Sequence, residues 1–129
     1  MKINVDWTFF LDVGTKGKCD KLIDKIRKSL DLELAVAKIE HYWKDKTLFK
    51  VNARSVFDAP TARDGLYLVM MTIDRLAHAW LVSVPKEEDH WEFGGTANRG
   101  SIRLQGIDSI SFNASNVMAE EQNAMILQA

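Results

Sequence analysis

Three histidines are the side chains of this sequence best suited to general acid or base chemistry, because imidazole titrates near neutral pH. His41 stands beside Tyr42 and Trp43, His78 lies in an apolar stretch, and His90 ends an acidic run. None has a second histidine at the spacing of a metal-binding motif, and one cysteine supplies no thiolate pair. The sequence therefore predicts no metal, no cofactor and no catalytic histidine.

The acidic run Glu87-Glu88-Asp89-His90 places three carboxylates next to an imidazole. A solvated loop seldom makes such oxygens converge on a cation without help from the rest of the fold. Three interpretations stay open: a plain solvated loop, a cation site and a surface that binds a basic partner. The partner-binding hypothesis takes in nearby acidic side chains, and its residues are Asp74, Glu87, Glu88, Asp89, His90, Glu92 and Asp108.

Two further kinds of active-site motif are weak or missing. Gly94-Gly95 and Gly100 lead into predicted strands, whereas a glycine-rich phosphate cradle normally leads into the N-terminus of a helix. None of the serines stands in a nucleophile elbow. We therefore expect a protein that is not an enzyme.

Alternating apolar residues predict most of the elements that must position these side chains. Ile3 to Val13 alternates as a strand does, Cys19 to Leu30 has the spacing of an amphipathic helix, and Leu34–Trp43 with Thr47–Phe57 forms a hairpin. Leu66 to Val84 fits either two buried strands or a helix; we favour a helix ending near His78 and a strand over 79–84.

The C-terminal third is predicted as a meander of short strands. Trp91 to Ala97 and Ser101 to Gln105 alternate, and Asn98-Arg99-Gly100 makes the turn between them. The parity changes within Gly106-Ile107-Asp108-Ser109, which predicts a bulge or tight turn. Ser115 or Asn116 would cap a short C-terminal helix through Leu127. The fold class expected is α+β: a largely antiparallel sheet with an N-terminal amphipathic helix and a second helix packed on one face.

Composition limits the classes of protein to consider. A chain of 129 residues, 47% hydrophobic, without linkers or repeats, predicts one domain over residues 1–129. A net charge of -1 gives no reason to expect nucleic acid or an anionic membrane as a partner. Residues 1–56 nevertheless carry a balance of +4 and residues 57–129 a balance of -5. This asymmetry survives folding only if the strand order keeps the two halves apart.

A cytoplasmic location is the simplest expectation. The single Cys19 lies on the apolar side of the predicted helix and is expected to be a buried, unreactive thiol, as suits a reducing compartment. The first ten residues alternate polar with apolar and lack the continuous apolar run of a signal peptide.

The tryptophans separate two hypotheses of function. Trp7, Trp43, Trp80 and Trp91 all fall on predicted core positions. The alternative hypothesis is a small ligand-binding or enzymatic domain, with a pocket lined by Trp43, Trp80, Tyr67 and the methionines and with His41 or His78 as acid or base. Because neither histidine has an evident polar partner, we favour a protein-binding module.

A resemblance gives this preference a concrete form. The stretch His90-Trp91-Glu92-Phe93-Gly94-Gly95, followed by Gly106-Ile107-Asp108-Ser109-Ile110-Ser111-Phe112, resembles the closing strands of small immunity proteins from bacterial contact-dependent growth inhibition systems. The resemblance covers about a quarter of the chain. It implies binding and neutralisation of a cognate toxin, no enzyme activity, and no particular contact residue. Many inhibitors of nuclease toxins are strongly acidic, and this chain is only slightly so.

Overall fold

The computed structural model describes residues 1–83 and 90–116. The expected α+β class is confirmed. The elements are β1 (Lys2–Leu11), α1 (Lys16–Leu30), β2 (Ala35–His41), β3 (Phe49–Asp58), α2 (Ala62–Asp74), β4 (Leu81–Val82), β5 (Glu92–Asn98), a 3-10 turn (Arg99–Ser101) and β6 (Ile107–Ser115). The acidic segment Glu87 to Asp89 and most of the predicted C-terminal helix lie outside the described residues.

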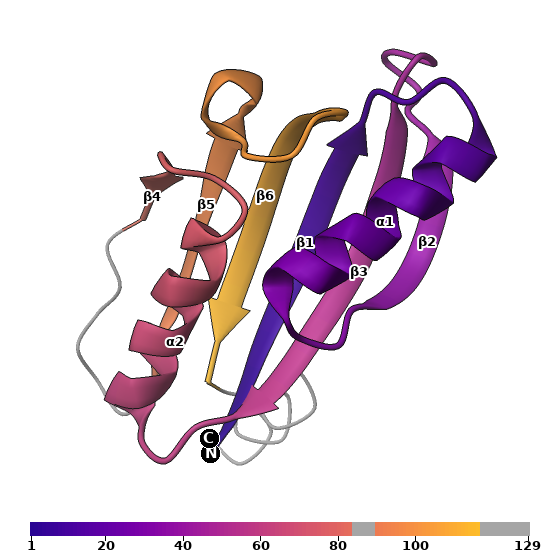
Figure 1. Ribbon diagram of the computed structural model, residues 1–129. Helices are drawn as coiled ribbons and strands as arrows, with labels where there is room; N and C mark the ends of the chain where they lie inside the picture. Colours follow the sequence, from indigo (N-terminus) through magenta and orange to yellow (C-terminus); the bar gives the residue numbers. More distant parts are fainter. Residues whose placement is uncertain (84–89, 117–129) are drawn as a thin grey trace.

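The strands form one six-stranded sheet in the order β2-β3-β1-β6-β5-β4, with antiparallel neighbours throughout (Figure 1). β1 lies inside the sheet between β3 and β6. Because side chains alternate along a strand, one face of β1 is wholly apolar and buried. The buried residues of that face are Ile3, Val5, Trp7, Phe9 and Leu11.

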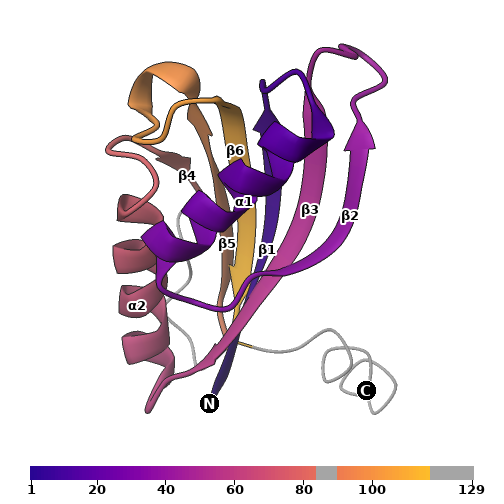
Figure 2. The same cartoon turned by 45° about the vertical axis from the view of Figure 1, so that its right-hand side comes forward.

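Both described helices cover that apolar face (Figures 1 and 2). Among residues 1–83 and 90–116, no helix lies on the opposite face of the sheet, called here the helix-free face. The amphipathic helix α1 is the second element of the chain, because β1 precedes it, and so it does not stand at the N-terminus as expected. The Thr15 side chain caps its first turn by accepting a hydrogen bond from the Lys18 backbone. Its buried side includes Cys19, which confirms the expected burial of the thiol.

The ambiguous segment after residue 60 is a helix, as favoured. α2 begins behind Pro60 with Thr61 as its N-cap and ends at Asp74, four residues before the expected end at His78. The helical series of hydrogen bonds stops early because the His78 N–H donates to the Ser101 carbonyl and the Leu76 carbonyl accepts from the Arg103 N–H. The Trp80 Nε1 also donates to the carbonyls of Ile73 and Ala77. The strand that follows, β4, has only two residues.

The expected strand over Ser101–Gln105 is wrong. After the 3-10 turn this segment is a loop across the end of the sheet, and its only strand-like contact is an isolated bridge between Ile102 and Ala77. Ile102 and Leu104 are both partly buried against the core, which explains why they alternate with polar residues. A loop that lies across the core can orient its side chains in this way as well as a strand can.

The predicted bulge at Gly106 to Ser109 is confirmed. On β1, Leu11 pairs with Ile107 while Phe10 pairs with Ser109, which leaves Asp108 as the extra residue. Gly106 leads into the bulge with a φ of 92°, a left-handed conformation that glycine adopts without steric cost.

The tryptophans divide between core and surface. Trp7 and Trp91 are buried and Trp80 is partly buried, as expected. Trp43 is 76% exposed in the β2–β3 hairpin, so its assignment to the core is wrong. Trp43 lies two residues beyond His41, the last residue of β2. The alternation of side chains along the strand therefore no longer directs its ring toward the core.

The strand order keeps the two halves of the chain apart. Residues 1–56 build β1, α1, β2 and most of β3, and the later described residues build the end of β3, α2 and β4 to β6. Within the described sheet the halves therefore meet where β1 pairs with β6 and where the last two residues of β3 pair with the start of β1. The described strands of the two halves are not interleaved. The first half keeps its balance of +4, whereas the described residues of the second half, 57–83 and 90–116, carry a balance of only -1. Helix α1 alone carries six Lys/Arg and two Asp/Glu, which matches the +4 balance of the first half.

Candidate interaction surfaces

Two of the predicted partner-binding carboxylates are held in ion pairs at one end of the sheet. Asp74 ends α2 and lies 3.4 Å from Nη2 of Arg103, whose Nε also donates to the Asp74 carbonyl. Asp108 lies in the β6 bulge and accepts from Nη2 of Arg99 at 3.1 Å. The same nitrogen donates to Asp12 at 2.9 Å, and this hydrogen bond is the main reason why the pKa of Arg99 is raised. Each of the two carboxylates therefore has an arginine partner, and Arg99 is shared between Asp108 and Asp12.

Glu92 and His90 lie at the opposite end of β5. Glu92 pairs with Ser115, whereas Asn98, at the far end of β5, pairs with Ser109 beside Asp108. At about 3.4 Å per residue, this seven-residue strand puts about 20 Å between Glu92 and the level of Asp108. Glu92 is exposed on the helix-free face and accepts a hydrogen bond from Asn113 Nδ2. The described members of the predicted set thus form two separate groups.

The aromatic pocket of the alternative hypothesis is not assembled. Trp43 follows β2 at one edge of the sheet, whereas α2, which carries Tyr67, lies over β5 and β6 toward the other edge (Figure 1). The ring of His41 packs on Phe49, with centroids 4.4 Å apart, and its Nδ1 lies 3.2 Å from the Lys46 carbonyl. His78 is exposed after the end of α2. Neither histidine has a carboxylate partner among the described contacts.

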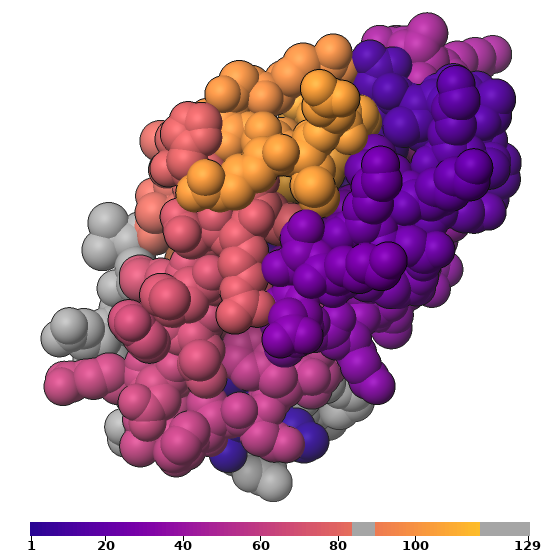
Figure 3. Space-filling view, viewed as in Figure 1, coloured from indigo at the N-terminus to yellow at the C-terminus, as the bar shows by residue number. Residues whose placement is uncertain are grey.

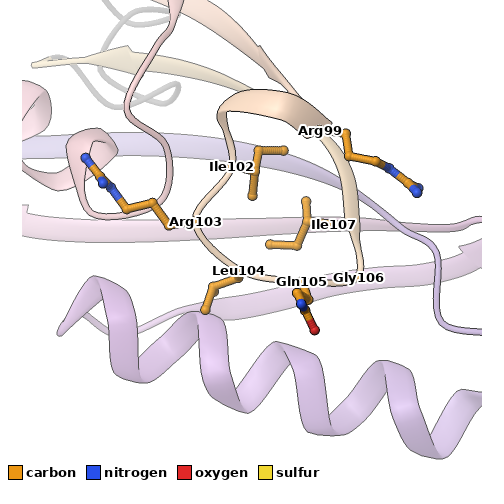
Figure 4. A pocket seen from close by; sticks show the side chains of 7 residues that line it. All are labelled: Arg99, Ile102, Arg103, Leu104, Gln105, Gly106 and Ile107. Carbon is orange, nitrogen blue, oxygen red and sulfur yellow. The ribbon is translucent and has the colours of Figure 1, made fainter.

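A hollow of about 250 Å³ lies inside the loop between β5 and β6 (Figure 4). Ile102 and Ile107 point into it, whereas Arg99 and Arg103 point away on either side toward their carboxylates. The lining, which also includes Leu104, Gln105 and Gly106, contains no carboxylate, imidazole, thiol or hydroxyl that could act as an acid, base or nucleophile.

A wider hollow of about 490 Å³ lies on the helix-free face over β1, β2 and β3. The small side chains of Ala35–Ala37 leave the space, and two polar pairs line it. Arg54 Nε donates to Asp6 at 2.8 Å, and Thr8 Oγ1 donates to Asn52 at 3.2 Å. Because these groups already bond to each other, the hollow holds no activated residue.

The outer side of α2 is an apolar surface that the sequence prediction missed. Tyr67 is 62% exposed, Met71 48%, Met70 43% and Leu68 38%. The alternative hypothesis placed Tyr67 and the methionines in a pocket. The available signal was the composition of the helix, which is apolar on nearly every side, as a helix with contacts on two sides is.

The outer side of α1 has the opposite character. Lys18, Lys21, Lys25 and Lys28 are all exposed on it, while Lys16 and Arg27 form ion pairs with Asp20 and Asp24 within the helix. This surface is strongly basic, and it contains no exposed large apolar side chain.

The described residues, 1–83 and 90–116, contain no cluster of three or more His, Cys, Asp or Glu side chains arranged to hold a metal ion. Across the same residues, no helix combines the length and apolarity needed to cross a membrane. Comparison of the chain with protein-family models, with curated proteins and with solved structures found no match.

Proposed function

We propose that this chain is a non-catalytic protein-binding module, and most concretely a bacterial immunity protein that binds and neutralises a cognate toxin in the cytoplasm. The observation that carries the proposal is the strand order β2-β3-β1-β6-β5-β4. It keeps the basic first half of the chain, with its balance of +4, apart from the nearly neutral described residues of the second half, so the described part of the molecule is electrically asymmetric. Such asymmetry accelerates encounter with a charged partner and favours one orientation.

The geometry favours one end of β5 as the toxin contact. Asp74 and Asp108 already have arginine partners, so a basic toxin would have to compete for them. Glu92 is exposed and bonded only to a neutral amide among the described contacts, and the sequence from Glu87 to Asp89 leads directly to His90. In the described residues 57–83 and 90–116 the charge balance is only -1, so most of the acidity of this half belongs to residues outside them. We therefore propose residues 87–92 as the contact with the toxin.

The test uses the product of the reading frame that neighbours the gene, because an immunity protein is normally encoded beside its toxin. Binding is measured by calorimetry at two salt concentrations, about 50 and 500 mM, since screening weakens an electrostatic contact. Charge reversal at Glu87, Glu88, Asp89 and Glu92 is expected to weaken binding at least tenfold, or about 1.4 kcal/mol. The matched control reverses Glu33 and Glu40, which are in the first half of the chain.

The control variant is expected to bind within about twofold of the parent chain, because its substitutions lie beyond β1 from the proposed contact. Equal weakening by both variants would show a general charge effect and would remove residues 87–92 from the interface. The proposal as a whole fails if the neighbouring product neither binds the chain nor slows the growth of cells that lack it.

A further inference from the structure

The outer side of α1 carries four lysines in one row along the helix. With about 100° of rotation and about 1.5 Å of rise per residue, they lie within a sector of about 80° and over a length of about 15 Å. Figure 3 shows α1, in purple, open at the surface beside the loop between β5 and β6, in orange. These four residues, called here the lysine stripe, are Lys18, Lys21, Lys25 and Lys28.

The ammonium groups of the lysine stripe have no counter-ion within the described part of the chain. The two carboxylates of α1 pair with other cations of the helix, Asp20 with Lys16 and Asp24 with Arg27. No described ion pair involves a side chain of the stripe. Like charges three or four residues apart on a helix repel each other. The stripe therefore carries positive charge that the described fold does not neutralise.

Part of the stripe borders a recess between α1 and the loop that joins β5 to β6. A hollow of about 190 Å³ lies there, lined by Val13, Lys18, Lys21, Leu22, Lys25 and Gln105. Its lining includes three cations, one amide and no carboxylate, so the recess favours an anionic group. Because pockets for whole drug-sized molecules measure about 300–1,000 Å³, this recess suits a single acidic side chain better.

We propose that the lysine stripe binds an acidic segment of another protein, with its carboxylates in one row. A partner helix with acidic residues at positions i, i+3, i+7 and i+10 repeats the spacing of the stripe, because α-helices share the same rise and rotation. The order of these spacings is the same in both directions, so the partner helix matches in either orientation. This inference is independent of the toxin contact, which is acidic and is proposed for residues 87–92.

Three observations favour an acidic protein over nucleic acid or a membrane. The chain beyond the stripe carries Asp31, the C-cap of α1, and Glu33, both exposed, so a phosphate backbone that continues in that direction meets like charge. The stripe contains no arginine to read base edges and no aromatic side chain to stack on bases. Helix α1 exposes no large apolar side chain that would insert into a bilayer.

The first test is a titration of the ¹⁵N-labelled full chain with a synthetic peptide, followed by NMR. The probe is an alanine-rich helix with glutamates at positions i, i+3, i+7 and i+10, in about 50 mM salt. Because exposed ion pairs are individually weak, we expect a dissociation constant on the order of 1 mM, with amide shifts centred on α1. Replacing the four lysines of the stripe by Gln, which has a similar helix propensity, is expected to weaken binding at least fivefold.

The matched control replaces four exposed lysines outside α1 by Gln and so removes the same amount of charge. It is expected to bind the peptide within about twofold of the parent chain, because its substitutions lie away from the stripe. Thermal unfolding of both variants monitors the fold. The control positions are Lys2, Lys38, Lys44 and Lys46.

The second test separates the row of carboxylates from total negative charge. The competing probes are a peptide of the same composition with its glutamates spread around the helix, a DNA oligonucleotide with the same number of charges, and vesicles that contain phosphatidylserine. The first peptide is expected to bind at least threefold more tightly than the rearranged peptide and the oligonucleotide. The vesicles are expected to cause no shifts in α1.

Several outcomes would overturn the proposal. These are a first peptide that causes no shifts in α1, a control variant that loses as much affinity as the stripe variant, and a rearranged peptide that binds equally well. Tighter binding of the oligonucleotide would make the stripe a nucleic-acid contact, and binding to the vesicles would make it a membrane contact. Either result refutes an acidic protein as the partner. Binding of the neighbouring gene product is measured separately, so failure here leaves the proposed function standing.

Discussion

Helices α1 and α2 lie on the same face of the same sheet, yet their outer sides differ in chemistry. Both bury aliphatic side chains against β1 and its neighbours. Away from the sheet, α1 presents four exposed lysines, whereas α2 presents Tyr67, Leu68, Met70 and Met71. Packing on the sheet constrains the residue types only on the side of each helix that faces the sheet. An outer side left to solvent is normally polar, so packing on the sheet does not account for the apolar outer side of α2.

The largest expected effect is a difference in reaction rate between a thiol on the inner side of a helix and a thiol on the outer side. Cys19 is fully buried in α1, and Met71→Cys places a second thiol on the exposed side of α2. Because a buried thiol reacts only when the structure opens, Cys19 is expected to react with a thiol reagent at pH 8 about 1,000-fold more slowly than Cys introduced at position 71. Two equally fast thiols would show that α1 is not firmly docked.

Burial also raises the pKa of the Cys19 thiol. The thiol of the unfolded chain ionises above about pH 8.5, whereas the buried thiol stays protonated at higher pH. Burial of the protonated thiol therefore contributes fully to the free energy of unfolding below that pH. This contribution is lost as the pH rises through the pKa of the thiol in the folded chain. Urea unfolding of the parent chain and of Cys19→Ala is expected to diverge in this direction above about pH 8.5.

The next expected effect tests whether the inner sides of the two helices are equivalent. Ile26 in α1 and Ile73 in α2 are both buried against the sheet. Replacing either by Ala removes buried methyl groups and leaves a cavity, so each is expected to lower the free energy of unfolding by about 2–5 kcal/mol in urea titrations. A loss below about 1 kcal/mol for Ile73→Ala would mean that α2 packs loosely, and the comparison with α1 would then fail.

The smallest expected effect is a change in the free energy of unfolding that has opposite signs in the two helices. A Cβ on Gly65 of α2 would overlap the buried Ile3 side chain, whereas a Cβ on Gly17 of α1 would meet no atom within 4 Å. Gly65→Ala is therefore expected to destabilise by about 1–3 kcal/mol despite its better helix propensity. Gly17→Ala is expected to stabilise by up to about 1 kcal/mol. Thermal unfolding measures both, and equal stabilisation would contradict the close packing of α2 on β1.

Local patterns predicted the elements whose side chains have one buried and one open side. The alternation of β1, the apolar side of α1 and the parity change at Asp108 were all readable, because each repeats at the period of its own backbone. The loop with Ile102 and Leu104 was misread, since alternation arises wherever a segment turns every second residue toward a core. A helix was favoured for α2. Because this helix is apolar on nearly every side, however, its periodicity does not show which side contacts the sheet.

The candidate acidic surface was less predictable than the fold. Glu92 and Asp108 are 16 residues apart in sequence and belong to paired strands, yet the antiparallel pairing sends them to opposite ends. Arg99 and Arg103, which neutralise Asp108 and Asp74, come from a loop that was expected to be a turn and a strand. A charge cluster depends on long-range neighbours, which a pattern of single residues does not contain.

The amino-acid sequence by itself determined the α+β class, the apolar inner side of α1, the β2–β3 hairpin and the bulge, because each depends on the backbone period of one segment or two neighbouring ones. Only the tertiary structure decided the strand order, the pairing of Asp74 and Asp108 with arginines, and which side of α2 stays exposed. These features depend on which distant segments become neighbours, and that choice is made by the packing of the whole sheet and its two helices.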